Sequence, residues 1–244
     1  MDIKLNNIVE PYNEFYGRVT KQMPRLVAEG RTPASVADVL ERRLHSDLQD
    51  WENNYFFTGD AIAYHPDKKF KIVLDAELLR NLTSKSDVSK GTLVLPDGLY
   101  ESLQSEEFLY KDVKNLLGEE LFQKEILQHP LWKAVARDQA LLEEYVPKMF
   151  AEMKERWNYK ENMGVYLDSL GVESPKLRAL VVNGFVDGSG LDGRNYLDFE
   201  NCRLVGVAPE ALNAHGKVIV KPSLETALSV VNEHLGKGLV LRTK

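Results

Sequence analysis

Hydrophobic periodicity changes along the chain, and the order of these changes limits the folds available to it. Apolar residues recur every three or four positions over 8–45 and again over 101–157, as on one face of a helix. Over 55–95 and 176–208, short β-branched and aromatic runs are bounded by turn-forming clusters, which is typical of strands. Separate runs of helix and strand indicate an α+β fold, with a mainly antiparallel sheet packed against two groups of helices.

The helical segments predict particular elements. The first helix is expected to carry an apolar face of six residues at helical spacing: Ile8, Tyr12, Phe15, Val19, Met23 and Leu26. Thr32 and Pro33 suit the start of a second helix. A long helix is expected from Pro130, with a bend near Pro147 because proline lacks an amide donor.

The strand segments predict a hairpin and a meander. "YFFTGDAIAYHPDKKFKIVLD" (55–75) has strand composition on both sides of a turn-forming "HPDKK", which favours a β-hairpin. Three later runs suit an antiparallel meander: 176–186, 195–199 and 202–208.

The end of the chain predicts a separate β-α-β unit. "KVIVK", a helix closed by Gly236 and "GLVLR" follow one another in a strand, helix, strand order. We therefore expect a main domain over 1–213, helical at 1–50 and 101–160 with sheet at 51–95 and 163–208. The C-terminal unit over 214–244 is expected to pack on or beside the same sheet.

Charge and cysteine content narrow the class of protein. The net charge is −6, and the longest basic cluster is "KKFK", so nucleic-acid binding is not expected. No apolar run approaches the ~20 residues that cross a bilayer, and the first residues lack the pattern of a signal peptide. Cys202 is the single cysteine, which suits a cytoplasmic setting without disulfides.

"VVNGFVDGSGLDGRNYLDF" (181–199) is the most distinctive stretch. Asp187, Asp192 and Asp198 could supply oxygen ligands to a hard cation, and the glycines between them would allow a tight turn. The EF-hand pattern fails, because Asp192 occupies the sixth position, where glycine is required. A turn in which aspartates bond to their own backbone explains the same residues, and we favour it.

Single residues elsewhere give weaker signals. Asp60 follows Gly59 within a strand pattern, which indicates a bulge, and bulges collect near active sites. A structural role is the simpler interpretation of Asp60. His129 before Pro130 is expected to cap a helix, and Cys202 is expected to be buried and inert.

Three segments carry a resemblance: "WENNYFFTGDAIAYHPDKKFKIVLDAELLR", "KAVARDQALLEEYV" and "RLVGVAPEAL". They resemble a family of uncharacterised proteins from small-genome archaea, over "QMPRLVAEGR" to about residue 213. The resemblance implies a cytoplasmic setting and no particular activity, ligand or site residue.

Two hypotheses for function follow. The first is a soluble, non-catalytic binding or scaffold protein that meets a protein partner through an acidic helical face, since 96–161 carries 14 acidic and 9 basic residues. The alternative is a metal-assisted hydrolase or transferase, in which Asp60, Asp187 and Asp192, with Asp198 nearby, hold a divalent ion that activates water. No other cofactor and no membrane partner is expected.

Overall fold

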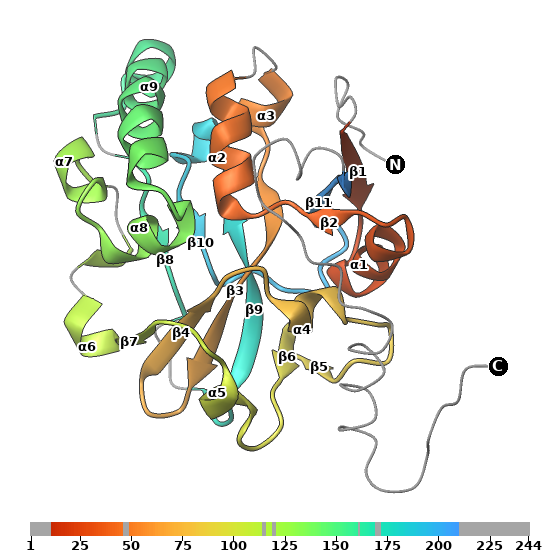
Figure 1. Ribbon diagram of the computed structural model, residues 1–244. Coiled ribbons are helices and arrows are strands. Elements are labelled where there is room, and N and C mark those ends of the chain that lie inside the picture. The colour runs from red at the N-terminus through yellow and green to blue at the C-terminus, as the bar shows by residue number, and fades with distance from the viewer. Residues whose placement is uncertain are drawn as a thin grey trace, which may run out of the picture. The chain divides into compact units, whose positions relative to one another are not determined.

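The computed structural model describes residues 11–45, 49–113, 116–118, 121–160, 162–168 and 172–209. A large sheet with helices around it forms this part of the chain, which confirms the α+β class (Figure 1). Its main path runs β1-β11-β3-β9-β10-β8. The bounds are β1 (Tyr12–Tyr16), β11 (Arg203–Val207), β3 (Phe56–His65), β9 (Lys176–Val182), β10 (Leu191–Asp192) and β8 (Val165–Tyr166).

Five further strands lie off this path: β2 (Thr32–Pro33), β4 (Lys69–Val73), β5 (Val88–Ser89), β6 (Thr92–Val94) and β7 (Glu107–Leu109). β4 pairs with β3, as the predicted hairpin requires, and places Ala61 opposite Val73. The sheet is mixed, because β11 runs parallel to β3 and β10 runs parallel to β8.

Nine α-helices are described: α1 (Val19–Ala28), α2 (Val36–His45), α3 (Gln49–Asn53), α4 (Glu77–Arg80), α5 (Leu99–Ser102), α6 (Tyr110–Val113), α7 (Gln123–Ile126), α8 (Pro130–Ala136) and α9 (Gln139–Trp157). Figure 1 shows α2 and α9 side by side, next to the 3-10 turn η2 (Phe185–Asp187). The site described below lies where α9 meets this turn.

The predicted first helix is wrong over its first part. Tyr12–Tyr16 forms β1, which pairs antiparallel with Arg203–Val207 along its whole length. Phe15, which was expected on the apolar face of a helix, lies in β1 and is buried there. Gly17 has φ +128°, a conformation that a side chain disfavours, and it separates β1 from α1.

Two further expectations are corrected. The helix predicted from Pro130 is interrupted at Arg137, which has φ +62°, and Asp138 then caps α9 through the amide of Ala140. The predicted meander is also wrong, because residues 195–199 form no strand and β11 pairs with β1 and β3. Long-range pairing decides the second outcome, and local periodicity cannot show it.

The predicted bulge is confirmed. The pairing of β3 with β9 shifts register between Phe57 and Ala61, which leaves Gly59 and Asp60 between them. The main-domain boundary near residue 213 and the β-α-β unit over 214–244 lie outside the described residues.

Candidate binding site at the Asp-Gly loop

A buried arginine anchors the glycine-rich loop. Arg43 on α2 is 1% exposed, and its Nη1 donates to Ser189 Oγ at 3.0 Å. The same guanidinium donates to the carbonyl oxygens of Trp51 at 2.6 Å and Asn54 at 2.8 Å. Tyr145 on α9 completes the network, with its Oη 2.8 Å from Ser189 Oγ. Because hydrogen bonds satisfy these buried groups, the loop is fixed to two helices.

The backbone of the loop needs its glycines for two reasons. Gly188 has φ +71°, in the left-handed region. A side chain on Gly190 would come within 2.8 Å of the carbonyl oxygen of Gly164. The predicted turn is therefore present, and its tight course carries Ser189 inward to Arg43.

Asp60 lies apart from the loop and is fully buried. Its carboxylate accepts from the backbone N–H of Val36 at 2.8 Å and of Asp75 at 2.9 Å. Arg137 Nη2 lies 2.5 Å from the same carboxylate and also bonds Asp75. Burial raises the pKa of Asp60, while the charge of Arg137 opposes that rise. Asp60 thus joins the bulge to the start of α9.

The other three aspartates do not converge on Asp60. Asp192 is paired with Arg194, and Asp187 and Asp198 are exposed. Within the described ranges, no group of three His, Cys, Asp or Glu side chains could hold a metal ion. The metal site at Asp60, Asp187, Asp192 and Asp198 stays a prediction, and the described residues do not bring these four carboxylates together around one point.

A polar pocket of about 420 Å³ opens beside the loop. Its described lining combines two tyrosines with hydrogen-bonding and charged groups: Tyr159, Tyr166, Asn183, Val186, Asp187, Gly188 and Arg194. Such a volume suits a small ligand or one side chain of a partner.

Arg194 is held in place at this pocket. Asp192 accepts from Arg194 Nη2 at 2.8 Å, from its Nε at 3.2 Å and from its backbone N–H at 2.7 Å. The guanidinium lies over the ring of Tyr166, 4.7 Å from its centroid. Hydrogen bonding to Asp192 raises the pKa of Arg194, so the group keeps its charge. The side chain is half exposed and yet oriented.

Four exposed residues make up what we call the loop surface: Val186, Asp187, Arg194 and Tyr196. Arg178 connects Arg194 and Tyr196. Its guanidinium donates to the carbonyl oxygen of Arg194 and lies 5.2 Å from the ring centroid of Tyr196. Val186 and Tyr196 are 47% and 51% exposed, which is high for large apolar side chains.

The acidic helical face is less acidic than its segment. α9 carries four glutamates and three basic residues, so its net charge is only −1. One of the basic residues, Arg156, forms ion pairs with both Glu152 and Glu52. The excess negative charge of 96–161 therefore lies mainly outside α9.

Two single-residue predictions are confirmed. His129 caps α8, because its Nδ1 accepts from the backbone N–H of Leu131. Cys202 is fully buried, and burial raises its thiol pKa to about 12, which makes it unreactive.

Arginines organise both aspartate sites, and the sequence patterns did not single them out. The pattern Asp192-Gly-Arg194 does indicate one of these contacts, because an aspartate side chain often accepts a hydrogen bond from the backbone N–H two residues later. Nothing local indicated that Arg43 and Arg137 would be drawn inward.

Comparison with known proteins gives a fold. No family model matches the chain, and no curated protein matches it. A solved structure, from work on the accommodation of massive sequence variation in Nanoarchaeota by the C-type lectin fold, aligns over 84% of this chain and 100% of its own. The TM-score is 0.63 at 19% identity. The chain shares the C-type lectin fold.

This fold agrees with the α+β class, and the neighbour's source agrees with the resemblance to proteins of small-genome archaea. Membership of that uncharacterised family stays a prediction. Among the described helices, none is both long and apolar enough to span a membrane.

Proposed function

We propose that this chain is a non-catalytic binding protein that recognises a protein partner through the loop surface. One observation carries the proposal: Arg194, fixed by Asp192 and laid over Tyr166, stands at the rim of a polar pocket. Tyrosine and arginine are the side chains that most often dominate binding energy at protein interfaces.

Preorganisation supports the same conclusion. A flexible arginine loses rotamer freedom when it binds, about 0.5–1.5 kcal/mol for each immobilised side chain. Asp192 and Tyr166 have already restricted Arg194, and Arg43 has fixed the loop that carries Asp187. Binding therefore costs less side-chain entropy than it would with a flexible arginine, and the affinity is correspondingly higher.

The fold neighbour adds a related argument. Its C-type lectin fold is described as accommodating massive sequence variation. Surface residues are the ones that usually change with little effect on stability. In this chain the loop surface is exposed, whereas Ser189 and Leu191 between its members are buried. Anchoring and recognition are thus assigned to different residues of one loop.

The acidic helical face is a weaker place for the same function. Long-range attraction to a basic partner needs a concentrated field, and α9 largely cancels its own charge. A cytoplasmic setting, predicted from the single cysteine, remains part of the proposal.

Affinity capture from extracts of the native cells, with three forms of the protein, tests the proposal. Wild type and Glu144→Gln/Glu155→Gln, which alters only the helical face, should retain the same partner. Arg194→Ala/Tyr196→Ala should lose it, at least tenfold in recovered amount, because each hot-spot residue contributes about 2 kcal/mol or more. Loss with the glutamine variant instead would move the site to α9.

A further inference from the structure

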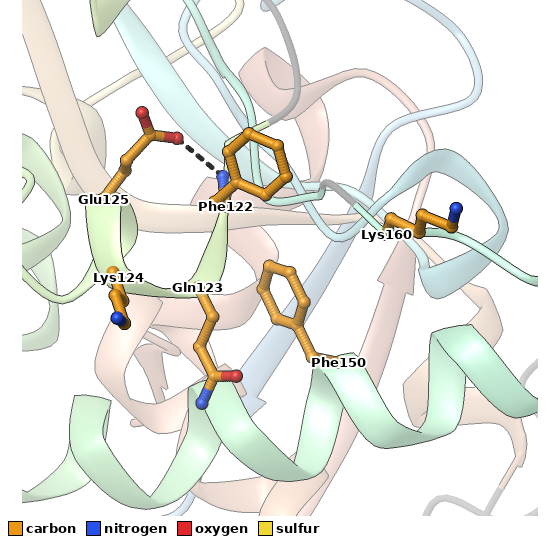
Figure 2. A pocket seen from close by; sticks show the side chains of 6 residues that line it. All are labelled: Phe122, Gln123, Lys124, Glu125, Phe150 and Lys160. Carbon is orange, nitrogen blue, oxygen red and sulfur yellow. Dashed lines mark hydrogen bonds between the residues drawn. The ribbon is translucent and has the colours of Figure 1, made fainter.

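A second pocket, of about 560 Å³, lies between α7 and α9. Phe122 and Phe150 face each other across it, and Lys160 lies to one side (Figure 2). Phe122 is 54% exposed, the largest value among the exposed large hydrophobic side chains of the described residues. An aromatic ring held open to solvent leaves apolar area that a ligand can bury.

A hydrogen bond from the backbone N–H of Phe122 holds this residue at the start of α7. Its N–H donates to Glu125 Oε2 at 2.7 Å, which is the bond that a glutamate at the third position of a helix makes to the residue before the helix. This bond directs the Glu125 carboxylate to the backbone, as Figure 2 shows. Glu125 keeps its negative charge, but its carboxylate is turned toward this N–H.

The other two charged side chains that line this pocket are positive. Lys124 and Lys160 both line it, both are exposed, and neither forms an ion pair with another described residue. Lys154 lies four residues after Phe150, on the same side of α9. Gln123 adds an amide that can donate to an anion.

We infer that this pocket binds a small amphipathic anion, with an aromatic or branched apolar body between Phe122 and Phe150 and an anionic head group attracted by Lys160 and Lys124, which flank the pocket on opposite sides. Apolar walls with cationic groups beside them complement both ends of such a molecule. The inference does not depend on the loop surface, which lies on other residues.

Two fluorescent probes test it: anilinonaphthalene sulfonate, and N-phenylnaphthylamine, which has the same rings and no charge. The anionic probe should bind the folded full chain at one saturable site and more tightly than the neutral one. Phe122→Ser should weaken both probes about fivefold or more, since burial of an aromatic ring supplies most of the affinity. Lys124→Gln/Lys160→Gln should weaken only the anionic probe, about three- to tenfold.

Phe199→Ser and Lys85→Gln are the controls, because both residues are exposed and lie away from this pocket. Both control variants should bind each probe with the affinity of wild type. Circular dichroism checks that every variant is folded. The inference is overturned if no saturable binding occurs, if Phe199→Ser has the larger effect, or if the lysine variant weakens both probes equally.

Discussion

Arg43 and Ser189 are joined by a 3.0 Å hydrogen bond, although 146 positions separate them in the sequence. The bond ties α2 to a loop that local rules describe only as a flexible connection. It explains how a stretch rich in glycine can present Asp187 and Arg194 in a defined arrangement.

Replacement of this arginine should loosen the loop. Arg43→Met leaves the Trp51 and Asn54 carbonyls without their donor, and buried groups without partners destabilise by about 1–3 kcal/mol each. We expect faster hydrogen exchange over 185–191 than in wild type, measured by mass spectrometry. The neighbouring Arg42→Met, at a half-buried position, should leave this exchange unchanged. Unaltered protection of the loop in Arg43→Met would show that the anchor lies elsewhere.

The Asp60–Arg137 pair makes a prediction for stability. Arg137→Met removes the only ion-pair partner that Asp60 has among the described residues and leaves a buried carboxylate, which costs about 3–5 kcal/mol. Asp60→Asn in the same chain should recover part of that loss, since it removes the charge. Urea unfolding measures both. The exposed Arg25→Met should stay within about 0.5 kcal/mol of wild type, and a similarly small effect of Arg137→Met would refute the role given to the pair.

His129 should make stability fall in mild acid. Burial lowers its pKa from the ordinary 6.5, so the folded chain favours the neutral ring that caps α8. Below that ordinary value the unfolded chain binds more protons, and stability is lost as the pH falls toward the lowered pKa. Urea midpoints between about pH 7.5 and 5.5 should decline less in His129→Asn, which keeps a capping side chain. Equal slopes in the two proteins would remove His129 as the cause.

Divalent ions should not stabilise the protein through its aspartates. Asp60 and Asp192 are already paired with arginines, and a ligand raises the melting temperature only if it binds the folded state. A thermal-shift series with Mg²⁺, Mn²⁺, Ca²⁺ and Zn²⁺ at millimolar concentration should show no rise. A rise that Asp187→Asn abolishes would support the metal-assisted alternative.

Local patterns were sufficient where contacts are local. The β3–β4 hairpin, the bulge at Gly59 and the His129 cap depend on turn chemistry and capping that a sequence displays. The glycines and aspartates of 187–193 indicate a turn in the same way, whereas the bond from Arg43 that anchors this turn comes from a distant part of the chain.

Distant partners decided the rest. Tyr12–Tyr16 has a spacing that suits a helix, and it becomes a strand because β11 lies beside it. Arg137 ends α8, and its guanidinium bonds Asp60, 77 positions earlier. The sequence favours a partner bound to glutamates of a helix, whereas the proposed function uses arginine and tyrosine from β8 and from the loop that follows β10. One sequence does not reveal such pairings.

Photocrosslinking in the native cells tests the central claim most directly. p-Benzoylphenylalanine in place of Tyr196 puts a reactive ring on the loop surface, and the same residue in place of the exposed Ala151 puts it on α9. We predict a discrete adduct with another protein from position 196 and none from position 151. An adduct from position 151 alone would contradict the proposed function.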